Sequence, residues 1–177
     1  MHCTRPRALA LALMLLAAGS PPALAADTGG VRAPSLQAPA PGAVATLDRF
    51  GMAHAPAAAP RAVKAAIRAG NELQGKPYVW GGGHGSWKSR GYDCSGTVSY
   101  VLHAAGLLGT PMASGPLMRY GLRGEGRWVT IRANSGHAFV YLAGLRLDTS
   151  GSGGRGPRWR AEPRSTAGFV ARHPVGL

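Results

Sequence analysis

The sequence predicts an α+β domain in which two helices precede a small antiparallel sheet. Residues 62–73 and 94–105 carry apolar side chains three and four positions apart, the spacing of amphipathic helices. From residue 128 onward, short apolar segments alternate with turn residues, which is typical of strands joined by hairpins. Helices followed by a run of strands, without regular alternation, indicate the α+β class.

In the first half, the helix over residues 62–73 is expected to follow Pro60 and to end before the stop signal Gly75-Lys76-Pro77. Tyr78–Trp80 is expected to form a short strand. The three glycines after it are expected to form a loop whose conformation only glycine adopts freely. The second helix is expected to begin at Cys94.

In the second half, residues 110–126 contain several Pro and Gly residues and predict a loop with a turn of helix over a cleft. Residues 151–163 predict a Gly/Arg loop around Trp159, and Gly168–Arg172 a last edge strand. We expect three antiparallel strands between these two regions: Trp128–Ile131, His137–Leu142 and Leu145–Thr149.

The N-terminus has the features of a secretory signal peptide over residues 1–25. Basic residues precede an apolar stretch, Ala8–Ala18, which is too short to span a bilayer. Ala23-Leu24-Ala25 supplies small residues for cleavage near Ala25–Ala26. We therefore expect an exported protein, periplasmic or secreted, with no membrane span in the mature chain. Residues 26–60 are rich in Ala and Pro and predict a flexible linker.

The formal net charge is +13, which favours anionic partners. The arginines are scattered singly, and no helix-turn-helix, zinc-finger or RNA-binding signature accompanies them, so we expect no nucleic-acid binding. An anionic cell envelope is the expected partner of this charge.

Cys94 is the candidate nucleophile. Cys3 would leave with the signal peptide, so Cys94 would be the single cysteine of the mature protein and could form no internal disulfide. A cysteine at a helix N-terminus lies where the helix dipole and free N–H groups stabilise a thiolate. The alternative is an inert buried cysteine, but its neighbours Asp93, Ser95 and Gly96 are poor core residues.

His137 and Asp148 are the candidate base and orienting group. A hairpin about Ala143-Gly144 would bring Asp148 across the ladder toward His137, where its carboxylate would stabilise the imidazolium. Both could instead be ordinary turn residues. His84, in the glycine loop before Cys94, is a rival base. The close-spaced ligand pairs of a zinc site are absent from the sequence, so we expect neither metal nor cofactor.

These motifs resemble the NlpC-type cell-wall cysteine peptidases, which are papain-like endopeptidases of bacterial peptidoglycan. The resemblance covers residues 62–150 and depends on three segments: PYVWGGG, GYDCSGTVSYVLHAAG and SGHAFVYLAG. It implies a papain-like fold over an NlpC-like catalytic domain, residues 61–177, with its core in 62–150 and a Gly/Arg-rich extension over 151–177.

The resemblance also implies roles for single residues. Cys94 would be the nucleophile, His137 the base and Asp148 the third member. Three more residues would contact the stem peptide: Tyr78, Asp93 and Ser95. Of these, Asp93 and Ser95 would help to hold the free amine of the stem peptide.

The expected activity is hydrolysis of an amide in peptidoglycan stem peptides. The resemblance implies that this amide is the γ-D-glutamyl-diaminopimelate bond. We expect the protein to be a monomer. The family's Pro-Arg-Ser/Thr stretch after the helix is replaced by TPMASGPLMRYG, and its Gly-Asp segment before the first strand by GEGRWVTIRANSG. Three alternatives stay open: an N-acetylmuramoyl-alanine amidase, a transglutaminase-like acyltransferase, and a non-catalytic basic envelope-binding protein.

Overall fold

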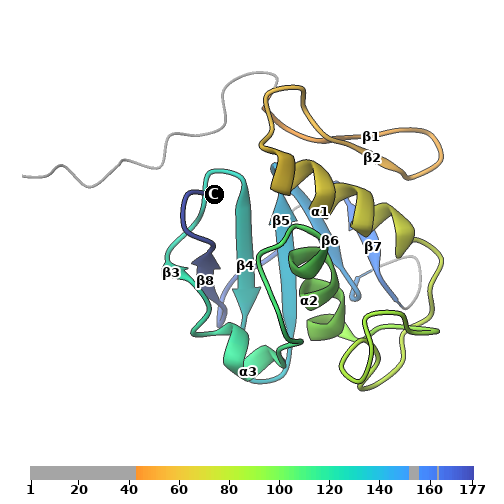
Figure 1. Ribbon diagram of the computed structural model, residues 1–177, viewed down its shortest axis with the longest axis vertical. Coiled ribbons are helices and arrows are strands. Elements are labelled where there is room, and N and C mark those ends of the chain that lie inside the picture. The colour runs from red at the N-terminus through yellow and green to blue at the C-terminus, as the bar shows by residue number, and fades with distance from the viewer. Residues whose placement is uncertain (1–42, 152–155, 163) are drawn as a thin grey trace, which may run out of the picture. The chain divides into compact units, whose positions relative to one another are not determined.

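The computed structural model describes residues 43–151, 156–162 and 164–177. The expected signal peptide and the first part of the expected linker, residues 26–42, lie outside the described residues. The described part confirms the α+β class. Helices α1 (Arg61–Glu72) and α2 (Cys94–Ala104) pack on an antiparallel sheet (Figure 1). Both helices lie close to the ranges that the apolar spacing predicts.

The sheet has six strands in the order β3-β8-β4-β5-β6-β7, and all neighbouring pairs are antiparallel. A short helix, α3 (Ser114–Leu117), precedes it within the region predicted as a loop with a turn of helix. The strands of the sheet are β3 (Leu122–Arg123), β4 (Val129–Ala133), β5 (Ala138–Leu142), β6 (Leu145–Asp148), β7 (Arg158–Arg160) and β8 (Val170–His173).

The main core lies between the helices and one face of the sheet. Alternation along β5 directs Val140 and Leu142 toward the helices, and both side chains are fully buried. Ile67 of α1 and Val98 of α2 are buried in the same cluster. Each such side chain contributes roughly 1.5–3 kcal/mol by leaving water. This core fixes α2, and therefore its N-terminus, against β5.

The opposite face of the sheet carries a second, smaller apolar cluster. Phe139 is fully buried but lies outside the main core, because its side chain alternates to the other face of β5. Its ring meets Phe169 edge-on at 5.1 Å and Tyr141 at 5.7 Å between centroids. Phe169 belongs to residues 164–169, which we call the cover segment because it packs on this face.

Residues 43–60 differ from the flexible linker that their composition predicts. They contain a two-stranded hairpin, β1 (Thr46–Leu47) with β2 (Ala53–His54). The side-chain amide of Asn71 on α1 accepts from the N–H of Ala53 at 2.8 Å and donates to its carbonyl at 2.9 Å. These paired bonds attach the hairpin to the domain.

Three smaller predictions about strands are wrong. Tyr78–Trp80 forms no strand, because a turn begins at Trp80, where the N–H of Gly82 donates to the carbonyl of Val79. Arg158–Arg160, predicted as loop, is β7; Trp159 anchors it by donating from Nε1 to Asn71 Oδ1 at 2.8 Å. The last strand, β8, is not an edge strand, because it lies between β3 and β4.

Candidate active site

Cys94 is the first residue of α2 and is 8% exposed. Asp93 caps this helix, with Oδ1 accepting from the N–H of Gly96 at 2.6 Å. The glycine loop packs so closely here that a Cβ on Gly96 would lie 2.0 Å from the carbonyl oxygen of Gly82. The motif around Cys94 therefore holds the thiol at a helix N-terminus, under a loop that requires glycine at position 96.

His137 follows a turn whose geometry is fixed by Asn134. The side-chain oxygen of Asn134 accepts from the N–H groups of Gly136 at 3.0 Å and His137 at 2.8 Å. The hydroxyl of Ser114 on α3 donates to the carbonyl of Ser135 at 3.1 Å. Asn134 thus orients the main chain of this turn, and the orienting contact on the imidazole comes from elsewhere.

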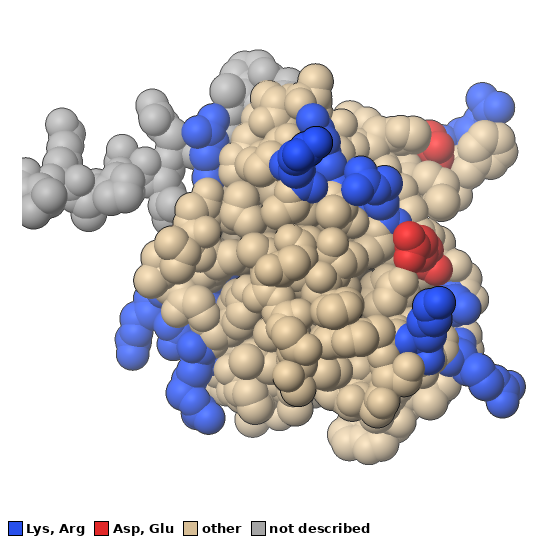
Figure 2. Space-filling model, in the orientation of Figure 1, with Lys and Arg blue, Asp and Glu red and all other residues tan. Residues whose placement is uncertain are grey.

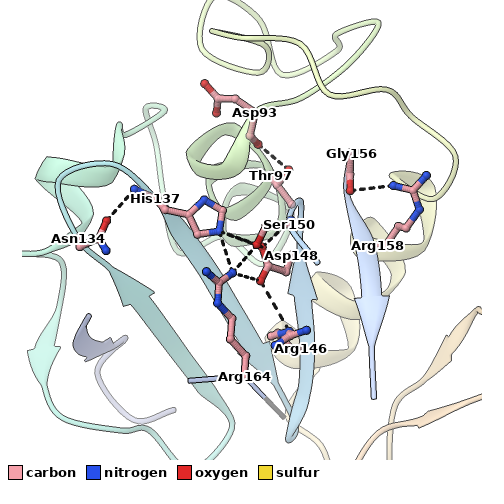
Figure 3. A network of polar contacts seen from close by, with 10 residues as sticks. All are labelled: Asp93, Thr97, Asn134, His137, Arg146, Asp148, Ser150, Gly156, Arg158 and Arg164. Atoms are coloured by element: carbon pink, nitrogen blue, oxygen red, sulfur yellow. Dashed lines mark hydrogen bonds and ion pairs between the residues drawn. The ribbon is translucent and has the colours of Figure 1, made fainter. Parts of the chain in front are cut away.

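That contact is Asp148 at the end of β6. Its Oδ1 lies 3.0 Å from His137 Nε2, and its side chain has no exposed surface (Figure 3). The N–H and hydroxyl of Ser150 also donate to Oδ1, at 2.9 and 3.0 Å. Because Nε2 faces Asp148, Nδ1 is the ring nitrogen left for Cys94, which is close enough to His137 for each group to shift the pKa of the other.

The site favours a charged imidazole beside an acidic thiol. Burial raises the pKa of Cys94, but hydrogen bonds from His137 and the Ala138 N–H, together with the imidazolium charge, give a net lowering. Burial lowers the pKa of His137, yet hydrogen bonds to Asp148 and Cys94 outweigh it and bring the pKa to about 9. Burial opposes the ionised form of Asp148 as well, but His137, Ser150 and Arg164 lower its pKa to about 2.

The chain therefore brings Cys94, His137 and Asp148 together as the sequence predicts. A thiol, a neighbouring imidazole and a buried carboxylate hydrogen-bonded to that imidazole form the arrangement that nucleophilic catalysis requires. The first turn of α2 adds N–H groups without intrahelical partners, which can stabilise an oxyanion.

Tyr78, Asp93 and Ser95, predicted to contact substrate, lie on the other side of Cys94. His84, the rival base, belongs with them: its Nε2 is 3.1 Å from both Asp93 Oδ1 and Ser95 Oγ. Burial raises the pKa of Tyr78, and the nearby charges of Cys94 and Asp93 raise it further. These groups lie near Cys94, and their role in binding stays a prediction.

Sequence reasoning missed Arg164 and Ser150, which both contact the His137–Asp148 pair. Arg164 is one of many arginines in a Gly/Arg-rich extension, and no local pattern distinguishes it. Within the described residues, no three His, Cys, Asp or Glu side chains are grouped to hold a metal ion. No helix of the described part is both long and apolar enough to cross a membrane.

No protein-family model matches the sequence, and the search of curated proteins gave no match either. Solved structures do match. The peptidoglycan hydrolase RipB of Mycobacterium tuberculosis is 28% identical with a TM-score of 0.53, over 67% of this chain and 70% of that one. The P60 domain of an antigen from M. avium subspecies paratuberculosis is 26% identical with a TM-score of 0.50, over 63% and 94% of the two chains.

The fold is therefore that of the NlpC/p60 domains, a papain-like class. The resemblance to the NlpC-type family that the sequence motifs carry is confirmed by these structural neighbours.

Proposed function

We propose that this protein is a peptidoglycan hydrolase that cleaves an amide bond in stem peptides through an acyl-enzyme on Cys94. One observation carries the proposal: the Cys94–His137–Asp148 arrangement in a fold shared with the peptidoglycan hydrolase RipB. The lowered pKa of Cys94 supports its role as nucleophile, since the thiolate is the attacking species.

In the proposed reaction, the Cys94 thiolate attacks the amide carbon and the oxyanion forms near the N-terminus of α2. The His137 imidazolium then donates its proton to the leaving amine, and the C–N bond breaks to leave a thioester. The neutral imidazole next takes a proton from water, whose oxygen attacks the thioester. Collapse of this second intermediate releases the carboxylate product and restores the thiolate–imidazolium pair.

For the bond, we propose γ-D-glutamyl-diaminopimelate, with Tyr78, Asp93 and Ser95 contacting the stem peptide. A buried carboxylate beside the nucleophile suits the free amine of a short peptide: the Asp93 side chain is 10% exposed. This assignment depends on the family resemblance together with the position of Asp93 next to Cys94.

The basic surface suits an anionic wall. Figure 2 shows Lys and Arg side chains around the edges of one face, with few acidic groups among them. We propose that this charge holds the enzyme near the envelope after export, with residues 1–25 removed as a signal peptide and residues 26–42 as a linker to the domain at 61–177. N-terminal sequencing of the exported protein tests this: a mature chain beginning at Ala26 is expected, and retention of Met1 would contradict it.

The reaction is tested by digesting purified peptidoglycan and identifying the fragments by mass spectrometry. The proposed endopeptidase yields fragments with a new amine on diaminopimelate, and Cys94→Ala yields none. An amidase would instead separate intact stem peptides from the sugar, and a transglutaminase-like acyltransferase would add an amine to the peptide.

A purely binding protein would yield no fragments, and its Cys94 would react slowly with iodoacetamide at mildly acidic pH. Rapid alkylation is expected of the activated thiol. Digestion by the Cys94→Ala protein would overturn the mechanism.

A further inference from the structure

Arg164, from the cover segment, contacts the pair of residues behind the thiol. Its Nη1 donates to Asp148 Oδ2 at 2.6 Å and to the hydroxyl of Ser150 (Figure 3). The same nitrogen lies 3.2 Å from His137 Nε2. Asp148 is therefore shared, with one oxygen toward the imidazole and the other toward the guanidinium.

The guanidinium is held in place by two aromatic rings. It lies 4.7 Å from the centroid of Phe139 and 5.3 Å from that of Phe169. The Arg164 side chain is 26% exposed, and cation–π contacts strengthen when water is excluded. The second apolar cluster thus fixes a positive charge beside the His–Asp pair.

Asp148 does not need Arg164 to stay in position. The N–H and hydroxyl of Ser150 both hold Oδ1, the oxygen that faces His137. Asp148 is also on a strand and its side chain is fully buried. The effect left to Arg164 is electrostatic, because it draws on the same carboxylate charge that stabilises the imidazolium and places a second cation 3.2 Å from Nε2.

We propose that Arg164 acts on this site through Asp148: its charge competes with His137 for the carboxylate and so keeps the imidazole able to release its proton. This inference rests on the proposed function, since it concerns the proton steps of that reaction. Without such competition, the imidazolium would be a weaker acid, and less of the neutral base would be present near neutral pH.

Acylation and deacylation depend differently on how firmly His137 holds its proton. Acylation needs the imidazolium to give its proton to the leaving amine. Deacylation needs a neutral imidazole to take a proton from water. A firmly held proton on His137 slows both steps, and at neutral pH it slows deacylation most, because the base form is then scarce.

Other charged groups also face this pair. The Arg146 Nε is 3.7 Å from Asp148 Oδ2, and the charge of Arg160 on β7 also interacts with that of Asp148. Cys94 faces His137 from α2, with Asp93 next to it. Arg164 contacts both Asp148 and the imidazole.

The direct test measures the protonation of His137 by NMR titration of its ring in a Cys94→Ala background. Arg164→Met keeps a long apolar side chain for Phe139 and Phe169 but removes the charge. A neighbouring cation disfavours the imidazolium, and this variant removes that cation. We therefore expect the pKa of His137 to rise by roughly one unit. Arg164→Lys keeps the charge, and its titration should resemble that of the parent.

Arg158→Met is the matched control. Arg158 pairs with Asp148 in the ladder, yet its guanidinium donates to the carbonyl of Gly156 and lies apart from the network (Figure 3). Its titration should stay at the parent value. If Arg164→Met leaves the pKa of His137 unchanged or lowers it, or if Arg164→Lys raises it equally, the proposal is overturned. Arg164→Gln provides a second neutral variant should the methionine variant fail to fold.

These measurements require no substrate, so they stand apart from the proposed hydrolysis. With Cys94 present, Arg164→Met should also move the pH optimum of turnover upward and accumulate acyl-enzyme at neutral pH. A raised pKa of His137 without any peptidoglycan cleavage by the wild-type chain would support the inference and refute the proposed function.

Discussion

Two His–Asp pairs flank Cys94, and their hydrogen-bond lengths are nearly the same. His84 lies 3.1 Å from Asp93 on the glycine-loop side, and His137 lies 3.0 Å from Asp148 on the sheet side. Distance alone does not say which imidazole could serve the thiol. The pairs differ in what else binds each carboxylate.

The carboxylate of Asp93 is occupied by the main chain. Its Oδ2 accepts from the N–H of Gly81 at 3.1 Å, and its Oδ1 from the N–H of Gly96. These bonds join the glycine loop to the start of α2. Asp93 thus caps the helix through these bonds, and His84 is a further contact of the same carboxylate.

The carboxylate of Asp148 is occupied by charged groups. Besides Ser150, its contacts are with His137, Arg164 and Arg146, all cationic or able to become so. A buried carboxylate among cations is suited to controlling a proton. The comparison teaches that the partners of the carboxylate, more than the His–Asp distance, indicate which pair is suited to catalysis.

The largest expected effect separates the two histidines. His137→Ala should slow both peptidoglycan cleavage and alkylation of Cys94 at pH 6 by roughly a thousandfold, because the thiol loses its base and its ion-pair partner. His84→Ala should cleave peptidoglycan at a rate within about tenfold of the wild-type rate. Rates for the two purified variants decide this, and a reversed order would identify His84 as the base.

The next effect separates the two carboxylates. Asp148→Asn should lower turnover by roughly a hundredfold or more, because a neutral amide no longer stabilises the imidazolium. Asp93→Ala should instead lower the free energy of unfolding in urea, because it removes a helix cap worth about 1–2 kcal/mol and a loop contact. If turnover by Asp148→Asn equals that of wild type, Asp148 is only a turn residue.

A third effect concerns the glycine-loop side alone. Gly96→Ala places a methyl group 2.0 Å from the Gly82 carbonyl, which is main chain and cannot rotate away. We expect a loss of roughly 1–3 kcal/mol in the free energy of unfolding. Gly85→Ala is the matched control, since a Cβ there meets nothing within 4 Å. Equal thermal stability of the two variants would contradict the close packing.

The sequence predicts the Cys94 side of the site better than the Arg164 side, for physical reasons. The two helices and the β5–β6 hairpin follow from local periodicity, and the pairing of His137 with Asp148 follows from that hairpin. Arg164 comes 16 residues after Asp148, through a segment without periodicity, so its contact depends on tertiary packing. The same holds for β7, where Trp159 reaches back 88 residues to Asn71.

The smallest expected effect is on stability as a function of pH. The pKa of Asp148 is about 2 in the folded chain and 3.8 ordinarily, so its contribution is complete above pH 3.8 and is lost as the pH falls toward 2. The contribution of His137, whose pKa rises from 6.5 to about 9, is complete below pH 6.5 and is lost as the pH rises toward 9.

Urea unfolding of wild type and Asp148→Asn at several pH values measures the acid side. The difference between their free energies of unfolding should shrink by about 2 kcal/mol as the pH falls from 3.8 toward 2. The equivalent comparison with His137→Ala should shrink on the alkaline side. A constant difference for Asp148→Asn across acid pH would mean that ionisation of the Asp148 carboxylate adds nothing to stability.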